Sequence, residues 1–320
     1  MNRAVEAYLA DLEVRRFSHS RCHHVARTLD RLLLYLRETH QVTDWRTVNE
    51  TRLRDFAVYA ATRHRTPKGK PISATTLRQW LSIIRSFFVW LNHNGRSLHN
   101  PAEGLAFPRK EQPLPRVLNE TDIARLIETP DTTAALGIRD RALMEVLYAT
   151  GIRHSEAHKL DLYDVDTAAL RLTVRLGKGQ RDRVVPLTES AAYWLARYLT
   201  AARPELAAGL WWGKGRRRGQ PKLIPPTSAL WLSVTGHRLS YQMIADRIRD
   251  YALQAEVKAS VHTFRHCCAT HLLRGGASVR HVQQLLGHGD LNSTEIYTHI
   301  ELTDLKRAIE GATSSTEMIE

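Results

Sequence analysis

The stretch VHTFRHCCATHLLRGGASVRHVQQLLGHGDLNSTEIYTHI (Val261–Ile300) sets the fold and chemistry expected of the whole chain. It contains a His-x-x-Arg pair, His262 and Arg265, a further His in a Leu-Gly-His triplet, His288, and Tyr297 nine residues later. Residues three apart lie on one face of a helix. The pattern therefore predicts that His262 and Arg265 face one phosphate together.

Two further basic residues stand upstream, each in a motif of its own. Arg153 lies in the string TGIRHSE, directly after a predicted helix over 139–149, and Glu156 follows within reach on a helical face. Lys178 lies between two glycines in a turn that joins predicted strands. We expect Glu156 to orient either the Arg153 guanidinium or neighbouring helices, and Lys178 to occupy a mobile hairpin tip.

These residue types suit attack on a phosphodiester. Planar guanidinium groups match two phosphate oxygens at once, and fixed positive charge stabilises the charge that develops during attack. A Tyr can serve as a nucleophile, and a Lys or His can protonate the leaving sugar oxygen. Because the protein supplies the cations, we expect no metal and no cofactor.

In chain order, these Arg, Lys, His, Arg, His and Tyr residues resemble the catalytic set of the tyrosine site-specific recombinases, the family of phage integrases and Xer recombinases. The resemblance covers nearly the whole chain and is densest over 118–305. It implies an enzyme that cleaves and rejoins DNA through a covalent 3′-phosphotyrosine intermediate at Tyr297, without metal or ATP.

The resemblance also implies roles for the other five catalytic positions. Arg153 and Arg265 would clamp the scissile phosphate, and Lys178 would donate a proton to the leaving 5′ oxygen. His288 would hydrogen-bond to the phosphate, and His262 would accept the Tyr proton or position the group. The pattern departs from the family at Ala157-His158, where bulkier apolar residues are common.

The expected fold class is mainly α with a small β-sheet or hairpin, in which the catalytic domain is α+β. Apolar residues at helical spacing predict four helices near 5–12, 26–36, 53–60 and 77–91. The expected organisation is an N-terminal helical, SAM-like core-binding domain over 1–105, a Pro-rich linker over 106–116, a catalytic domain over 117–312 and a flexible tail over 313–320. By resemblance, the two domains form a C-shaped clamp around DNA.

The net charge of +13 favours a polyanionic partner, here double-stranded DNA, although a solvated basic surface is the plainer alternative. The segment 211–222 is strongly basic and could contact DNA, contact another protomer or be a solvated loop. The expected DNA-contacting residues are Arg63, Arg65, Lys68, Lys70, Arg78, Arg85, Arg181, Arg216, Arg217 and Arg218.

The remaining patterns concern location and assembly. The N-terminus lacks a signal peptide, no apolar run is long enough for a membrane span, and Cys22, Cys267 and Cys268 suit a reducing cytosol. We expect a cytoplasmic, nucleoid-associated protein with no membrane partner. The resemblance implies a tetramer on DNA, built from this chain alone or with a second recombinase.

Three alternatives stay open at this point. His262, His266, Cys267, Cys268 and His271 could hold zinc, but the i, i+4 pairs among them point to different helix faces and no second ligand cluster accompanies them. A type IB topoisomerase shares the catalytic design, and a non-catalytic DNA-binding regulator could share the fold. Within recombination, the role could be integration or excision of a mobile element, or resolution of chromosome or plasmid dimers.

Overall fold

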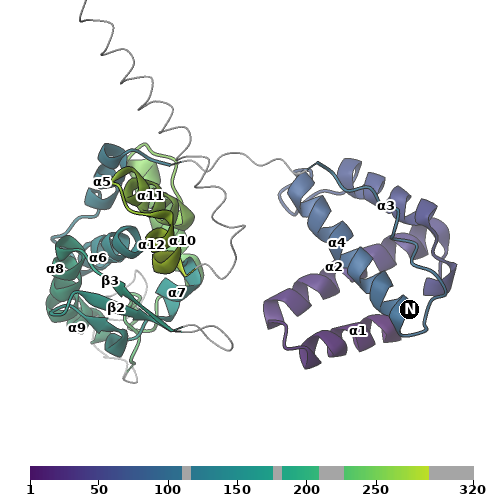
Figure 1. Ribbon diagram of the computed structural model, residues 1–320, viewed down its shortest axis with the longest axis horizontal. Helices are drawn as coiled ribbons and strands as arrows, with labels where there is room; N and C mark the ends of the chain where they lie inside the picture. The colour runs from purple at the N-terminus through teal and green to yellow at the C-terminus, as the bar shows by residue number, and fades with distance from the viewer. Residues whose placement is uncertain (110–116, 176–181, 209–226, 288–320) are drawn as a thin grey trace, which may run out of the picture. The chain divides into compact units, whose positions relative to one another are not determined.

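A computed structural model gives the fold and describes residues 1–109, 117–175, 182–208 and 227–287 (Figure 1). The chain divides into two compact units, Met1–Pro113 and Leu114–Glu320. Helices dominate, and the strands described form one antiparallel sheet of three strands in the order β1-β2-β3. The predicted class, mainly α with a small β-sheet, is therefore confirmed.

Residues 1–109 form a helical bundle whose helices begin where the sequence supplies caps. Ser18, Asn49 and Ser73 each accept a hydrogen bond from a backbone N–H in the first turn of the helix that follows. The apolar faces of the helices share one core, which includes Phe56, Phe87 and Phe88. The four predicted helices are confirmed as α1 (Asn2–Val14), α2 (His19–His40), α3 (Glu50–Thr62) and α4 (Ala74–His93).

The second unit packs its helices around α6 (Ala135–Thr150), which is buried on nearly every face (Figure 1). The sheet consists of β1 (Val165–Asp166), β2 (Arg171–Val174) and β3 (Arg183–Pro186), and its hairpin pairs Leu172 with Val185. The other α-helices described are α5 (Glu120–Glu128), α7 (His154–Lys159), α8 (Glu189–Arg197), α9 (Arg203–Ala207), α10 (Tyr241–Gln254), α11 (Val261–Arg274) and α12 (Val279–Leu286).

One local expectation was wrong. The sequence ALWLSVTG around Trp231 predicts a short strand, but the chain there makes only the isolated bridges Asp161–Ala229 and Leu232–Arg238. The reason is that side chains take the backbone groups a ladder would use. The Tyr198 hydroxyl accepts from the Leu232 N–H and donates to the Leu230 carbonyl, at 3.0 and 2.9 Å.

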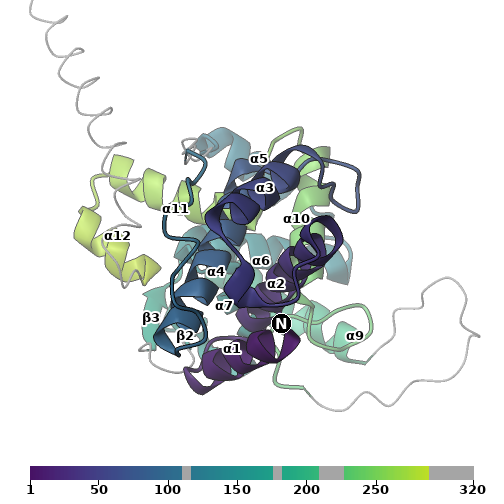
Figure 2. The same cartoon turned by 90° about the vertical axis from the view of Figure 1, so that its right-hand side faces the viewer.

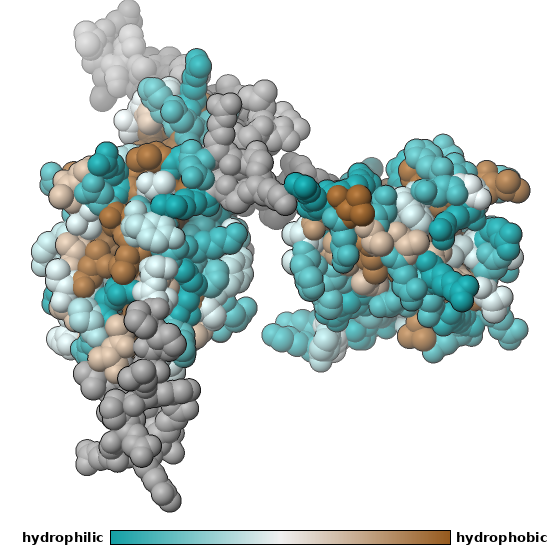
Figure 3. Space-filling model, turned by 90° about the horizontal axis from the view of Figure 1, so that it is seen from below, coloured by the Kyte–Doolittle hydropathy of each residue, from teal (hydrophilic) through white to brown (hydrophobic). Residues whose placement is uncertain are grey.

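Hydrophilic side chains cover most of the visible face of each unit, with a few apolar patches between them (Figure 3). Within the described ranges, no helix combines the length and the apolar character needed to cross a membrane.

Candidate active site

The site begins where α6 ends. Gly151 closes α6 with a left-handed backbone, φ 59°, and the chain passes through Ile152 to Arg153, the N-cap residue of α7. A Cβ on Gly151 would lie 2.7 Å from Leu286 Cδ2. Glycine is therefore required here both for the positive φ and for the close approach of α12.

Glu156 holds Arg153 in two ways. Its carboxylate accepts from the Arg153 backbone N–H at 2.8 Å and from Arg153 Nη1 at 2.9 Å. Arg153 Nη2 donates to the Gly287 carbonyl at 3.1 Å. The Arg153 side chain remains 36% exposed, whereas that of Glu156 is 5% exposed. Glu156 and the Gly287 carbonyl thus fix the orientation of the guanidinium, while part of the Arg153 side chain stays exposed to solvent, as phosphate binding requires.

The protonation state of Glu156 suits this role. Burial raises the pKa of its carboxyl, but hydrogen bonds and charge from Arg183, together with hydrogen bonds from Arg153, outweigh burial and lower the pKa to about 2. The carboxylate is therefore ionised at neutral pH.

Arg265 comes from α11 and is 8% exposed. Its Nη1 donates to the Gly151 carbonyl at 2.7 Å and its Nη2 donates to the Leu286 carbonyl at 2.9 Å. Both acceptors belong to helix C-termini, the negative ends of the α6 and α12 dipoles, which favour a cation. Since Arg153 binds the next carbonyl, that of Gly287, the structure brings the two predicted phosphate-clamping arginines together.

His262 lies one helical turn before Arg265 on α11, and its side chain is exposed. It lines a surface depression of about 560 Å³ together with Arg249, Lys258 and His266. Burial lowers the pKa of His154, and this effect outweighs the hydrogen bond with the Tyr241 carbonyl, which raises it. His262 therefore shares the helix of Arg265 but borders an open depression.

Half of the predicted catalytic set belongs to segments that the structure does not describe. Lys178, His288 and Tyr297 lie outside the described residues, and so do the predicted DNA contacts Arg181, Arg216, Arg217 and Arg218. In the sequence, His288 follows directly after Gly287, the C-cap of α12.

Sequence reasoning missed one residue of this site. Arg183, the first residue of β3, places its guanidinium against both Glu156 and the end of α12. The only signal in the sequence was a basic residue at the start of a predicted return strand.

Four of the predicted DNA contacts lie in a turn of the first unit, between α3 and α4. Arg65 and Pro71 form a bridge that closes the turn, and the side chains of Arg63, Arg65, Lys68 and Lys70 are all exposed. The turn therefore presents several cations to solvent.

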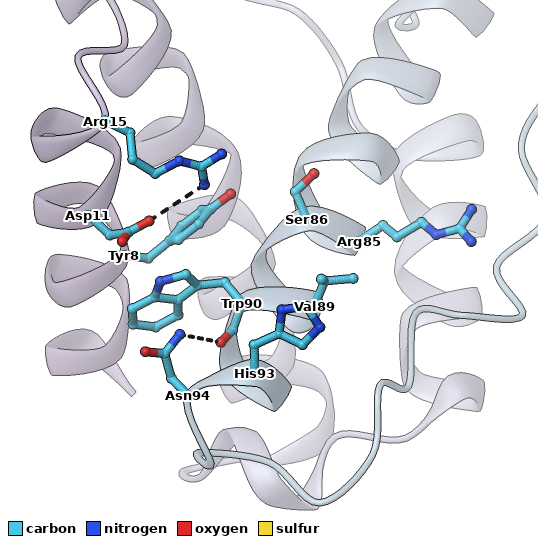
Figure 4. Close-up of a pocket in the computed structure, with 9 residues that line it drawn as sticks. All are labelled: Tyr8, Asp11, Arg15, Arg85, Ser86, Val89, Trp90, His93 and Asn94. Atoms are coloured by element: carbon cyan, nitrogen blue, oxygen red, sulfur yellow. Dashed lines mark hydrogen bonds and ion pairs between the residues drawn. The ribbon is translucent and has the colours of Figure 1, made fainter.

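Arg78 and Arg85 on α4 behave differently from the turn residues, because both lie over the Phe107 ring, at 5.5 and 5.9 Å. Arg78 also donates to the Pro108 carbonyl at 2.5 Å. A pocket of about 490 Å³ opens between α1 and α4, where Asp11 pairs with Arg15 at 3.7 Å and Arg85 extends away from α1 (Figure 4).

Two side chains of the zinc alternative, those of His271 and Cys267, have structural partners. His271 contacts the Tyr148 hydroxyl through Nδ1 and the Leu118 carbonyl through Nε2, both at 2.9 Å. Cys267 Sγ accepts from the Leu118 N–H at 3.3 Å. These contacts tie α11 to α6 and to the residues before α5. Among the residues that the structure describes, no three His, Cys, Asp or Glu side chains are grouped to hold a metal ion.

Comparison with known proteins decides the family. Residues 116–303 match the phage integrase family, and residues 5–95 match the phage integrase N-terminal SAM-like domain. The chain belongs to the phage integrase family. It is therefore a tyrosine recombinase, a site-specific enzyme that cleaves and rejoins DNA strands, and the resemblance seen in the sequence is confirmed.

Two curated tyrosine recombinases illustrate the relationship. XerD of Listeria monocytogenes is 33% identical over 309 residues, which cover 96% of this chain and 97% of that protein. XerC 2 of Ralstonia nicotianae is 38% identical over 253 residues, which cover 78% of this chain and 68% of that protein.

Solved structures share the fold of this tyrosine recombinase. A lambda integrase dimer bound to a COC′ core site matches with a TM-score of 0.68 and 14% identity, over 93% of this chain and 94% of that one. XerH bound to its difH substrate matches with a TM-score of 0.66 and 20% identity, over 90% and 78%. The two-domain recombinase fold predicted from the sequence is thus confirmed.

Proposed function

We propose that this recombinase uses Tyr297 as its nucleophile and Arg153, Lys178, His262, Arg265 and His288 as the groups that bind and activate the scissile phosphate. The observation that carries the proposal is the pair of guanidiniums, Arg153 and Arg265, anchored on adjacent carbonyls at the end of α12. Two fixed, partly desolvated cations side by side suit a phosphate that gains charge during attack.

In the proposed cleavage step, the Tyr297 hydroxyl oxygen bonds to phosphorus and the bond to the 5′ oxygen breaks. The Tyr proton passes to His262 or to solvent, and Lys178 protonates the 5′ oxygen as it leaves. A 5′ hydroxyl of the partner strand then attacks the phosphotyrosine and releases Tyr297. The number of phosphodiester bonds is unchanged, so the reaction needs no ATP.

The proposed substrate is double-stranded DNA, gripped by a helical domain over 1–105 and a catalytic domain over 117–312, joined by a linker over 106–116 and followed by a tail over 313–320. The exposed turn with Arg63, Arg65, Lys68 and Lys70 supports phosphate contacts by the first unit. Arg78 and Arg85 beside Phe107, with Arg181 and Arg216–Arg218, complete the proposed DNA contacts. We also propose that the protein assembles as a tetramer on two DNA sites. It would act in the cytoplasm, in association with the nucleoid.

Resolution of chromosome or plasmid dimers is the role we favour over integration of a mobile element. The supporting observation is that a relative called XerD aligns with almost the entire length of this chain. The same alignment favours a recombinase over the topoisomerase and regulator alternatives.

Capture of covalently attached DNA tests the proposal. The protein is expressed in cells, denatured and recovered with any attached DNA, whose ends are sequenced, with Tyr297→Phe as the control. We expect Tyr297-dependent enrichment of one short inverted repeat. Attachment scattered over the genome would favour a topoisomerase, and intact binding without attachment would contradict the proposal. A site at the boundary of an inserted element would support integration over dimer resolution.

A further inference from the structure

Arg183 lies beside the site and has no role in the reaction proposed above. It is the first residue of β3, but its side chain is only 11% exposed because it turns toward α7 and α12. Figure 1 and Figure 2 both show β3 close to α12. Nη1 and Nη2 donate to the two oxygens of Glu156 at 3.2 and 2.8 Å, and Nε donates to the Leu285 carbonyl at 3.0 Å. Each guanidinium nitrogen therefore has a protein partner.

The first consequence concerns charge. Glu156 orients Arg153 but also neutralises it, and a neutralised arginine attracts phosphate less strongly. Because Arg183 pairs with both oxygens of the same carboxylate, one negative charge is shared between two guanidiniums. The group of three side chains keeps a net positive charge, so Arg153 is both held and available to an anion.

The second consequence concerns the end of α12. Three successive carbonyls there, those of Leu285, Leu286 and Gly287, accept hydrogen bonds from Arg183, Arg265 and Arg153 in turn. A Cβ on Gly287 would lie 2.9 Å from the Arg183 guanidinium carbon, so this side chain packs directly on the helix end. The three arginines therefore set the point from which the chain continues to His288 and Tyr297.

We propose that Arg183 is a positioning residue for the strand-cleavage step, an inference that rests on the proposed function. Through Glu156 it fixes the Arg153 guanidinium. Through the Leu285 carbonyl it fixes the end of α12, which the sequence joins to the segment that carries Tyr297. Arg183 also links α7 and α12 to β3, the strand that follows the Lys178 turn in sequence.

The test separates DNA affinity from cleavage. The probe is a duplex of the sequence recovered by covalent capture, nicked beside the scissile phosphate so that the short fragment leaves and the adduct accumulates. The dissociation constant is measured by anisotropy, and the single-turnover rate of adduct formation is measured at saturating protein. Arg171→Met is the matched control, since Arg171 lies in the same sheet but is exposed and pairs with Asp166 at the surface.

We expect Arg183→Met to lower the cleavage rate ~100-fold, as small misplacements of catalytic groups do, with affinity changed less than ~3-fold. Arg183→Lys keeps the charge, but one ammonium cannot span Glu156 and the Leu285 carbonyl, so it should restore only part of the rate. Adding Glu156→Gln to Arg183→Met should slow cleavage no further than the slower single variant, because both changes act on Arg153 through one contact.

Several results would overturn the inference. One is a cleavage rate for Arg183→Met equal to that of Arg171→Met. Another is a loss of DNA affinity that accounts for the whole loss of rate. A third is a double variant in which the rate losses of Arg183→Met and Glu156→Gln multiply. If Arg183→Met does not fold, a wild-type cleavage rate for Arg183→Lys overturns it instead. If the wild-type protein forms no adduct, the proposed function fails; if the wild type cleaves and Arg183→Met cleaves equally fast, only the role of Arg183 fails.

Discussion

Replacing Glu156 with Gln tests how the arginine cluster is held together, because it removes one negative charge and nearly preserves the shape of the side chain. The carboxylate accepts from the Arg153 backbone, from the Arg153 guanidinium and from Arg183. A Gln side chain offers one acceptor oxygen and turns its NH₂ group toward a cation. We expect the fold to lose stability around α7 and the end of α12.

The size of the loss follows from the pKa of the carboxyl, which is lowered from 4.5 to about 2. A tenfold change in proton affinity corresponds to about 1.4 kcal/mol, so the ionised group stabilises the fold by about 3 kcal/mol more than a neutral one. Because the folded pKa lies below the unfolded value, this stability is complete above pH 4.5 and is lost as the pH falls toward 2. The gap between the wild type and Glu156→Gln should be about 3 kcal/mol at pH 7 and about 1 kcal/mol smaller at pH 3.5.

The measurement is urea unfolding of the full chain at pH 7, 5 and 3.5, followed by hydrogen exchange of peptides from α6 and α7 so that the second unit reports separately. Asp246→Asn is the control. Its pair with Arg249 is exposed, and its loss should cost less than about 1 kcal/mol. A gap for Glu156→Gln below about 1 kcal/mol at pH 7, or one that stays constant down to pH 3.5, would refute the reasoning.

Three further substitutions test separate parts of the site. Arg265→Lys should lower the cleavage rate ~100- to 1,000-fold, because one ammonium cannot reach both the Gly151 and Leu286 carbonyls; a wild-type single-turnover rate would contradict this. Gly151→Ala should lower the free energy of unfolding by about 1–3 kcal/mol, because of the positive φ at this position and the clash of the new Cβ with Leu286. An unchanged Tm would contradict this and would show that α12 can shift to make room for the Cβ. Tyr198→Phe should lower the free energy of unfolding in urea by about 1–3 kcal/mol, because the buried Leu232 N–H loses its acceptor. An unchanged free energy of unfolding would mean that this N–H has a different acceptor in the variant.

Local signals in the sequence were sufficient for most helices. Ser73 and Asn119 cap α4 and α5, because an N-cap needs only a short polar side chain three residues before a backbone N–H. Gly151 ends α6 because a left-handed C-cap favours glycine. These features depend on residues a few positions apart, which the sequence displays directly.

The contacts of Arg183 could not be predicted in this way. Its partners Glu156 and Leu285 lie 27 and 102 residues away in sequence, and they meet only after α7, β3 and α12 have packed. The prediction of a strand around Trp231 failed for the same reason. Tyr198 lies 34 residues before Leu232 and hydrogen-bonds to backbone groups that a β-ladder would have used. Tertiary contacts overrode the local preference in both cases.

Identification of the nucleotide-bearing peptide tests the central claim most directly. The covalent complex is digested with nuclease and trypsin and analysed by mass spectrometry. Cleavage after Arg280 and Lys306 releases a peptide in which Tyr297 is the only tyrosine. The account predicts a 3′-linked nucleotide on this tyrosine and no adduct with Tyr297→Phe. A nucleotide on any other residue, or an adduct that survives Tyr297→Phe, would contradict it.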